Sequence, residues 1–119
     1  MEDSILKSVK NYVNVNPDDT VFDDELLMDI NTTFFALNQI GAGPETPFTI
    51  SDDTAVWTDF ISDIDTLSAV KSYVCLRVRR MFDPPTSGSL DTALKELIAE
   101  YEWRINIAVD PGPKEVGNG

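Results

Sequence analysis

The chain has 119 residues and a formal net charge of −12, with 42% hydrophobic and 25% charged residues. This size suits one compact domain with its own core. The sequence has no histidine and one cysteine, which excludes an intramolecular disulfide, structural zinc and nucleophiles activated by histidine. No apolar run approaches the roughly 18 residues of a membrane span, and the acidic start MEDSILKSVKN argues against a secretory signal. We expect a soluble protein made in the cytoplasm, without membrane contact or cofactor.

The charge is unevenly distributed along the chain. Residues 11–70 contain twelve acidic residues and no lysine or arginine, whereas the remainder contains nine acids and nine bases. An acidic half repels phosphates and offers no basic groove that would release counterions from DNA. The sequence therefore argues against ordinary DNA binding.

The first predicted helix covers residues 4–13, where apolar side chains recur at helical spacing. Asp3 or Ser4 is its expected N-cap. The sequence NVNP at 14–17 ends the helix, because asparagine and proline favour turns.

A second helix is predicted from Thr20, which begins a sequence like a capping box with aspartate in place of glutamate. Its first turn holds the acids at 23–25, where the positive end of the helix dipole favours them. Gly41 ends it. Residues 41–53 contain two glycines and two prolines, so they are expected to form an irregular loop with at most one short strand at 48–50.

Two further helices follow this loop. Thr54 is the expected cap of a short one, and Asp65 is the expected cap of a long one that runs to Phe82. Both show apolar side chains at spacings of three and four. The short helix presents Trp57, Phe60, Ile61 and Ile64, and the long one carries a stripe of Leu67, Val70, Val74, Val78 and Met81.

Three arginines, Arg77, Arg79 and Arg80, gather at the end of the long helix. Cations there complement the negative end of the helix dipole. Asp83 precedes Pro84, and a residue before proline avoids the helical region, so the helix stops. The pattern explains the position of the arginines but leaves open whether they pair within the chain or with a neighbouring subunit.

The final helix is expected to start at Ser89 and to contain an ion pair between Glu100 and Arg104. Trp103 lies off its apolar stripe. It either contacts a partner, as tryptophans at interfaces often do, or covers the edge of the core.

These elements predict an all-α fold, a small bundle of four to five helices with one irregular loop. Residues 1–106 form the expected single domain. Residues 107–119 are expected to be a flexible tail that becomes ordered on a partner.

The segment SAVKSYVCLRVRRMFDPPTSGSLDTALKELIAEYEWRI resembles the head–tail connector proteins of tailed bacteriophages, also called head-completion or DNA-packaging adaptor proteins. The likeness lies in a helix that ends in a basic, aromatic, acidic and diproline turn at residues 80–85. It continues in a short serine-rich loop and a last helix that ends in Glu102, Trp103 and Arg104. The short first helix, the turn and the segment DDELLMDINTTFFAL resemble the family too, so the likeness covers most of the chain.

The resemblance implies a structural virion protein of the neck region, made in the bacterial host cytoplasm, that catalyses nothing. Such proteins form a ring of about a dozen copies below the portal protein. The ring extends the DNA channel and docks a neck or tail-completion protein. DNA passes without specific binding, which an acidic lumen favours by repulsion over a Debye length of about 8–10 Å.

A ring built from head-to-tail contacts needs two different complementary faces on each subunit. We hypothesise that the arginine cluster of one subunit meets the acids of its neighbour. The interface residues of this hypothesis are Arg77, Arg79, Arg80, Asp18, Asp19, Asp23, Asp24 and Trp103. A second hypothesis assigns docking on the portal or a neighbour to Ile107, Val109 and Val116.

Two other classes of function fit the acidic composition. One is an inhibitor that mimics DNA, or another helical inhibitor of protein interactions. The other is a carboxylate enzyme that recruits a divalent cation to paired acids such as Asp52 and Asp53. Adjacent acids at a helix start do not converge on one ion, which argues against the enzyme.

Overall fold

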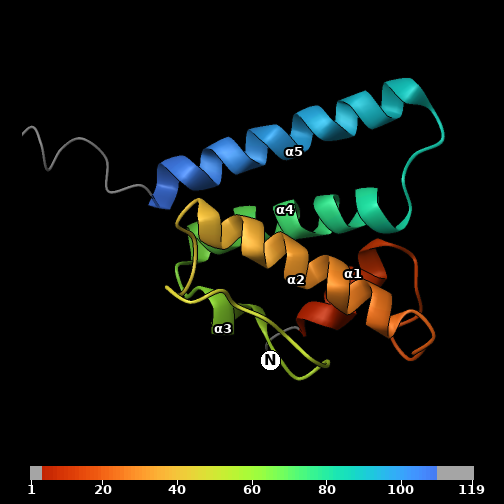
Figure 1. The fold of residues 1–119 in the computed structure, drawn as a ribbon, viewed down its shortest axis with the longest axis horizontal. Coiled ribbons are helices and arrows are strands. Elements are labelled where there is room, and N and C mark those ends of the chain that lie inside the picture. Colours follow the sequence, from red (N-terminus) through yellow and green to blue (C-terminus); the bar gives the residue numbers. More distant parts are fainter. Residues whose placement is uncertain (1–3, 110–119) are drawn as a thin grey trace, which may run out of the picture.

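A computed structural model of the chain describes residues 4–109. This part is all-helical, as predicted, and contains no strand beyond an isolated antiparallel bridge between Ser4 and Val56. Its helices are α1 (Ile5–Tyr12), α2 (Asp23–Gln39), α3 (Trp57–Phe60), α4 (Ile64–Phe82) and α5 (Gly88–Val109). The long helix α4 contacts all the others. The helices α1, α2 and α3 lie on one side of it and α5 on the other (Figure 1). Among the described residues, no helix is long and apolar enough to cross a membrane.

The start of the chain is held by one side-chain cap and one buried cation. Ser4 is the N-cap of α1, and its hydroxyl accepts the Lys7 N–H at 3.2 Å. Lys10, at the end of α1, is buried. Its ammonium lies 2.6 Å from Oδ1 of Asp23 and donates to the backbone carbonyls of Pro17 and Asp19 at 3.3 and 2.9 Å. Because a buried charge without partners is costly, these contacts fix the turn between α1 and α2.

The start of α2 differs from the prediction. Thr20 does not cap the helix, which begins at Asp23 after Phe22 without a side-chain cap. The Thr20 carbonyl instead accepts the Asp23 N–H at 3.2 Å, and the Asp19 carboxylate accepts the Val21 N–H at 3.0 Å. The turn residues thus satisfy one another before the helix starts. The C-terminus agrees with the prediction, since Gly41 follows with a φ of 93°, which favours glycine.

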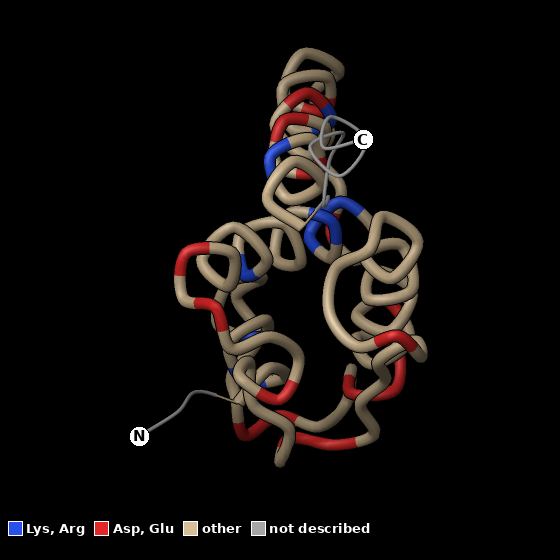
Figure 2. Tube along the Cα trace, turned by 90° about the vertical axis from the view of Figure 1, so that its left-hand side faces the viewer, with Lys and Arg blue, Asp and Glu red and all other residues tan. Residues whose placement is uncertain are grey.

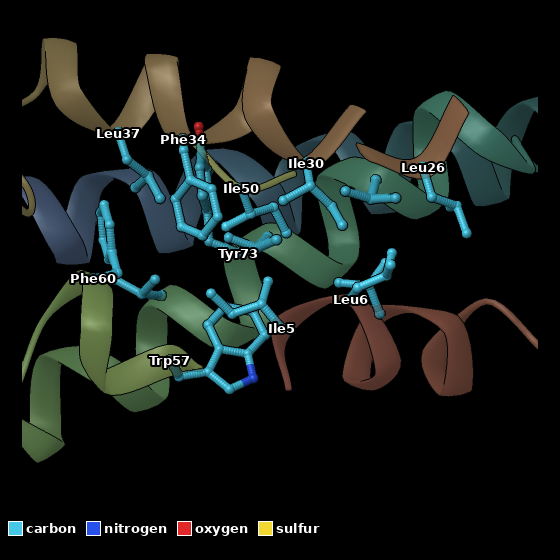
Figure 3. Close-up of a cluster of buried hydrophobic side chains, with 14 of the residues drawn as sticks. Ile5, Leu6, Leu26, Ile30, Phe34, Leu37, Ile50, Trp57, Phe60 and Tyr73 are labelled. Atoms are coloured by element: carbon cyan, nitrogen blue, oxygen red, sulfur yellow. The ribbon is translucent and has the colours of Figure 1, made fainter. Parts of the chain in front are cut away.

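The core lies where α2 crosses α4, with α1 and α3 closing it (Figure 3). Each fully buried large apolar side chain contributes about 1.5–3 kcal/mol to stability. Phe34 of α2 packs against Phe48 and Phe60 with ring centroids 5.0 and 4.7 Å apart. Buried side chains include Ile5, Leu6 and Val9 of α1, Leu26, Ile30 and Leu37 of α2, Trp57 of α3, and Val70, Tyr73, Val74 and Val78 of α4. The predicted stripe of α4 is rotated toward Tyr73, which leaves Met81 exposed.

The loop between α2 and α3 is fastened to α2 by one side chain. Asn31 donates from Nδ2 to the Ile50 carbonyl at 2.9 Å and accepts the Ile50 N–H on Oδ1 at 2.8 Å. Ile50 thereby receives the two hydrogen bonds that a neighbouring strand would provide. Residues 48–50 form no strand, although a short one was considered for them.

Helix caps after this loop were also predicted at the wrong residues. Val56, not Thr54, precedes α3, and the Asp59 carboxylate accepts its N–H at 2.9 Å. Asp63, not Asp65, caps α4 by accepting the Thr66 N–H at 3.2 Å.

The last helix, α5, is long and little buried. Ser87, not Ser89, provides its side-chain cap, because its hydroxyl accepts the Leu90 N–H at 3.4 Å. Of its 22 residues only Ile105 is buried, and Leu90 and Leu97 of the predicted apolar stripe are exposed. The helix extends to Val109, three residues beyond the expected domain boundary at 106. A hairpin of α4 and α5 thus projects one long helix into solvent (Figure 1).

Candidate assembly interface

Arg77 belongs to a polar network that ties α4 to α5. Its Nη1 donates to the Tyr73 hydroxyl at 2.9 Å, and its guanidinium lies over the Tyr73 ring at 5.7 Å from the centroid. The Tyr73 hydroxyl donates in turn to Oε2 of Glu102 at 2.8 Å. Burial, together with the hydrogen bond to Glu102, raises the pKa of Tyr73 to about 12, so the phenol stays protonated and keeps donating.

Arg80 pairs within the chain across the loop between α4 and α5. Its Nε and Nη2 donate to Oδ1 and Oδ2 of Asp91 at 2.9 and 3.2 Å. These hydrogen bonds lower the pKa of Asp91. Two-pronged pairs of this kind fix geometry more than they stabilise, because exposed ion pairs contribute about 0–1 kcal/mol.

Arg79 is placed differently. Within residues 4–109 it makes no hydrogen bond or ion pair. Successive residues of a helix are rotated by about 100°, so Arg79 lies on another face of α4 than Arg77 or Arg80. The three arginines therefore do not form a single patch.

An open groove of about 330 Å³ lies between α4 and α5. Its basic groups are Arg77, Arg80 and Lys95, and its apolar surface comes from Met81, Ile98 and Ala99. Glu102 also lines it, with Oε2 occupied by Tyr73. Lys95, which the sequence analysis did not single out, makes the groove more basic. An antiparallel hairpin brings residues 95, 98 and 102 opposite the end of α4, and this spacing was the signal that could have revealed the groove.

The predicted acidic partners lie in the turn between α1 and α2. Asp23 is occupied by Lys10, and the Asp19 carboxylate holds the turn. Asp18 and Asp24 are exposed and make no ion pair within the described residues. Most lysines and arginines lie on α4 and α5, whereas loops at the opposite end of the molecule are dominated by acids (Figure 2). These paired acids have different contacts and do not converge on one point.

The other predicted interface residues have separate surroundings. Trp103 is 64% exposed, so it does not cover the core edge. Ile107, one turn further along α5, is 57% exposed. Val109 is half-buried against the core, where its side chain lies near Gly41. Val116 lies outside the described residues.

An all-helical subunit with a basic groove on one hairpin and a fixed acidic turn elsewhere belongs to a class of small adaptors that act through contacts with other proteins. The chain belongs to the phage connector protein family, whose model matches residues 5–112. No curated protein and no solved structure matches it significantly. Membership confirms the resemblance seen in the sequence. The protein is a structural connector of the phage virion and interacts with other head or tail proteins.

Proposed function

We propose that the protein assembles as a ring of about a dozen subunits below the portal. The ring extends the DNA channel and docks a neck or tail-completion protein. DNA moves through it without specific binding. The subunit has no enzymatic role and is made in the host cytoplasm before it joins the virion neck.

The uneven charge carries this proposal. Twelve acids and no base occupy residues 11–70, and the exposed members of this set can line a channel that repels phosphate over about 8–10 Å. Acidic walls let DNA slide, because they form no ion pairs that each advance would have to break.

Exposed apolar residues on α5 support docking on further proteins. Trp103 and Ile107 lie one turn apart on the solvent side of this helix. Tryptophan is a frequent anchor of interfaces. We assign these two residues to the contact with the portal or a neighbouring subunit, and extend this assignment to Val109 and Val116.

Light scattering and negative-stain imaging over a concentration series test the proposal, first with the protein alone and then with its portal. Rings of about a dozen subunits, formed alone or on the portal, are the expected result. A protein that remains monomeric in both experiments, and instead blocks a DNA-binding enzyme, would establish the inhibitor function.

A further inference from the structure

The groove between α4 and α5 has two cationic groups that its own chain leaves available. Arg77 uses one of its five N–H donors on Tyr73. Lys95 is exposed and forms no ion pair within residues 4–109. Arg80, in contrast, has its guanidinium engaged by Asp91. The groove therefore combines a basic rim with an apolar floor of Met81 and Ile98, which fits an acidic segment that also presents a small apolar side chain.

The turn between α1 and α2 has that chemistry. Asp18 and Asp24 are exposed acids, and Val21 between them is 78% exposed. The turn is fixed before any partner arrives: Lys10 holds its backbone carbonyls, and Asp18 donates its N–H to Oδ1 of Asn16 at 2.9 Å. Binding a fixed turn costs less conformational entropy than binding a flexible one.

The turn cannot enter the groove of its own chain. Lys10 ties it to α1 through Asp23. Phe22 packs edge-to-face on Phe82 at the end of α4, with centroids 5.3 Å apart. The two complementary surfaces are therefore distinct parts of one rigid subunit, and they can only meet between copies.

We propose that the groove of one subunit receives the turn between α1 and α2 of the next. Arg77 and Lys95 face Asp18 and Asp24, and Val21 lies on the apolar floor. Two different surfaces make a head-to-tail contact, which repeats around a closed ring. This inference rests on the proposed ring and names its contact, and it replaces Arg80 in the earlier hypothesis by Lys95.

Charge reversal tests the contact. Lys95→Glu and Asp18→Lys should each raise the concentration needed for assembly about a hundredfold, because like charges then face each other. The double variant, which restores opposite charges, should recover most of the loss. Lys7→Glu is the matched control: it changes net charge equally on an exposed lysine of α1, outside both surfaces, and should assemble like the wild type. Sedimentation velocity measures assembly, and circular dichroism checks that every variant is folded.

Cysteine pairing gives an independent readout. A variant with Asp18→Cys and Lys95→Cys should form a ladder of disulfide-linked multimers under oxidation, whereas each single variant should not. The experiment is run on the assembled form, either the free ring or the portal-bound protein. Wild-type rings with unaffected reversal variants and no ladder would overturn the groove–turn contact alone. A wild type that stays monomeric, alone and on the portal, would overturn the proposed ring with it.

Discussion

Tyr73 of α4 donates a hydrogen bond from its buried phenol to Glu102 of α5, 2.8 Å away. It lies near the middle of the hairpin, between the Arg80–Asp91 pair beside the connecting loop and the buried Ile105. These contacts set how α4 and α5 lie against each other. The walls of the basic groove stand on the same two helices, so its shape depends on them.

Replacing Tyr73 by phenylalanine should destabilise the fold by about 1–2 kcal/mol, because Glu102 and Arg77 lose a shared hydrogen-bonding partner. Urea unfolding followed by circular dichroism measures the change. Tyr12→Phe is the control, since that phenol lies on the surface. Equal effects of the two substitutions would mean that the network contributes nothing.

Asp91 gives the hairpin a pH dependence. Its pKa is lowered by Arg80, so its stabilising effect is complete above its unfolded pKa of about 3.9 and is lost as the pH falls through the lower folded value. Asp91→Asn should lower the melting temperature at pH 7, and the difference from the wild type should vanish in acid.

Glu96→Gln is the control for this experiment, because it removes a carboxylate from an exposed position on the same helix. It should leave the pH profile unchanged. A difference between Asp91→Asn and the wild type that persists at pH 2 would show that Asp91 acts through packing rather than charge.

Asn31→Ala should release the loop between α2 and α3. It leaves the N–H and carbonyl of Ile50 without their partner, at a cost of about 1–3 kcal/mol. Hydrogen exchange at the Ile50 amide should accelerate. Asn38→Ala, which removes bonds to exposed loop carbonyls further along α2, should cost less. If both variants were equally stable, the Asn31 contacts would not fasten the loop.

Asp29 should behave in the opposite sense to Asp91. Burial and the nearby charge of Glu25 raise its pKa, and no described residue hydrogen-bonds its Oδ2. A raised pKa costs stability once the pH passes the unfolded value. Asp29→Asn should therefore stabilise the protein at pH 7 by up to about 0.5 kcal/mol, a small gain because solvent screens the carboxylate. Thermal melts at pH 3, where both forms are neutral, should show no gain.

The periodicity of apolar residues was sufficient to predict the long helices, because burial against α4 requires that spacing. Their caps were harder. Thr20, Thr54, Asp65 and Ser89 each have a polar neighbour within a few residues that can accept the same backbone N–H, and tertiary contacts decide between them. At α4, Asp63 rather than Asp65 bonds Thr66, one turn ahead.

The candidate site was only partly predictable for the same reason. Charge spacing alone revealed the arginine cluster and the acidic half. The division of labour among the arginines depends on the hairpin, which brings Asp91 to Arg80 across 11 residues of sequence and leaves Lys95 beside Arg77. Chain order does not specify such a juxtaposition until both helices are in place.

The exposure of α5 has a consequence for the life of the free subunit. A helix with one buried side chain opens locally at a small cost in free energy. Proteases cut such transiently opened segments, so surplus copies that find no partner should be cleaved first along α5. Partner binding closes that route by mass action. The supply of intact subunits would then follow the number of available docking places, without any dedicated regulator.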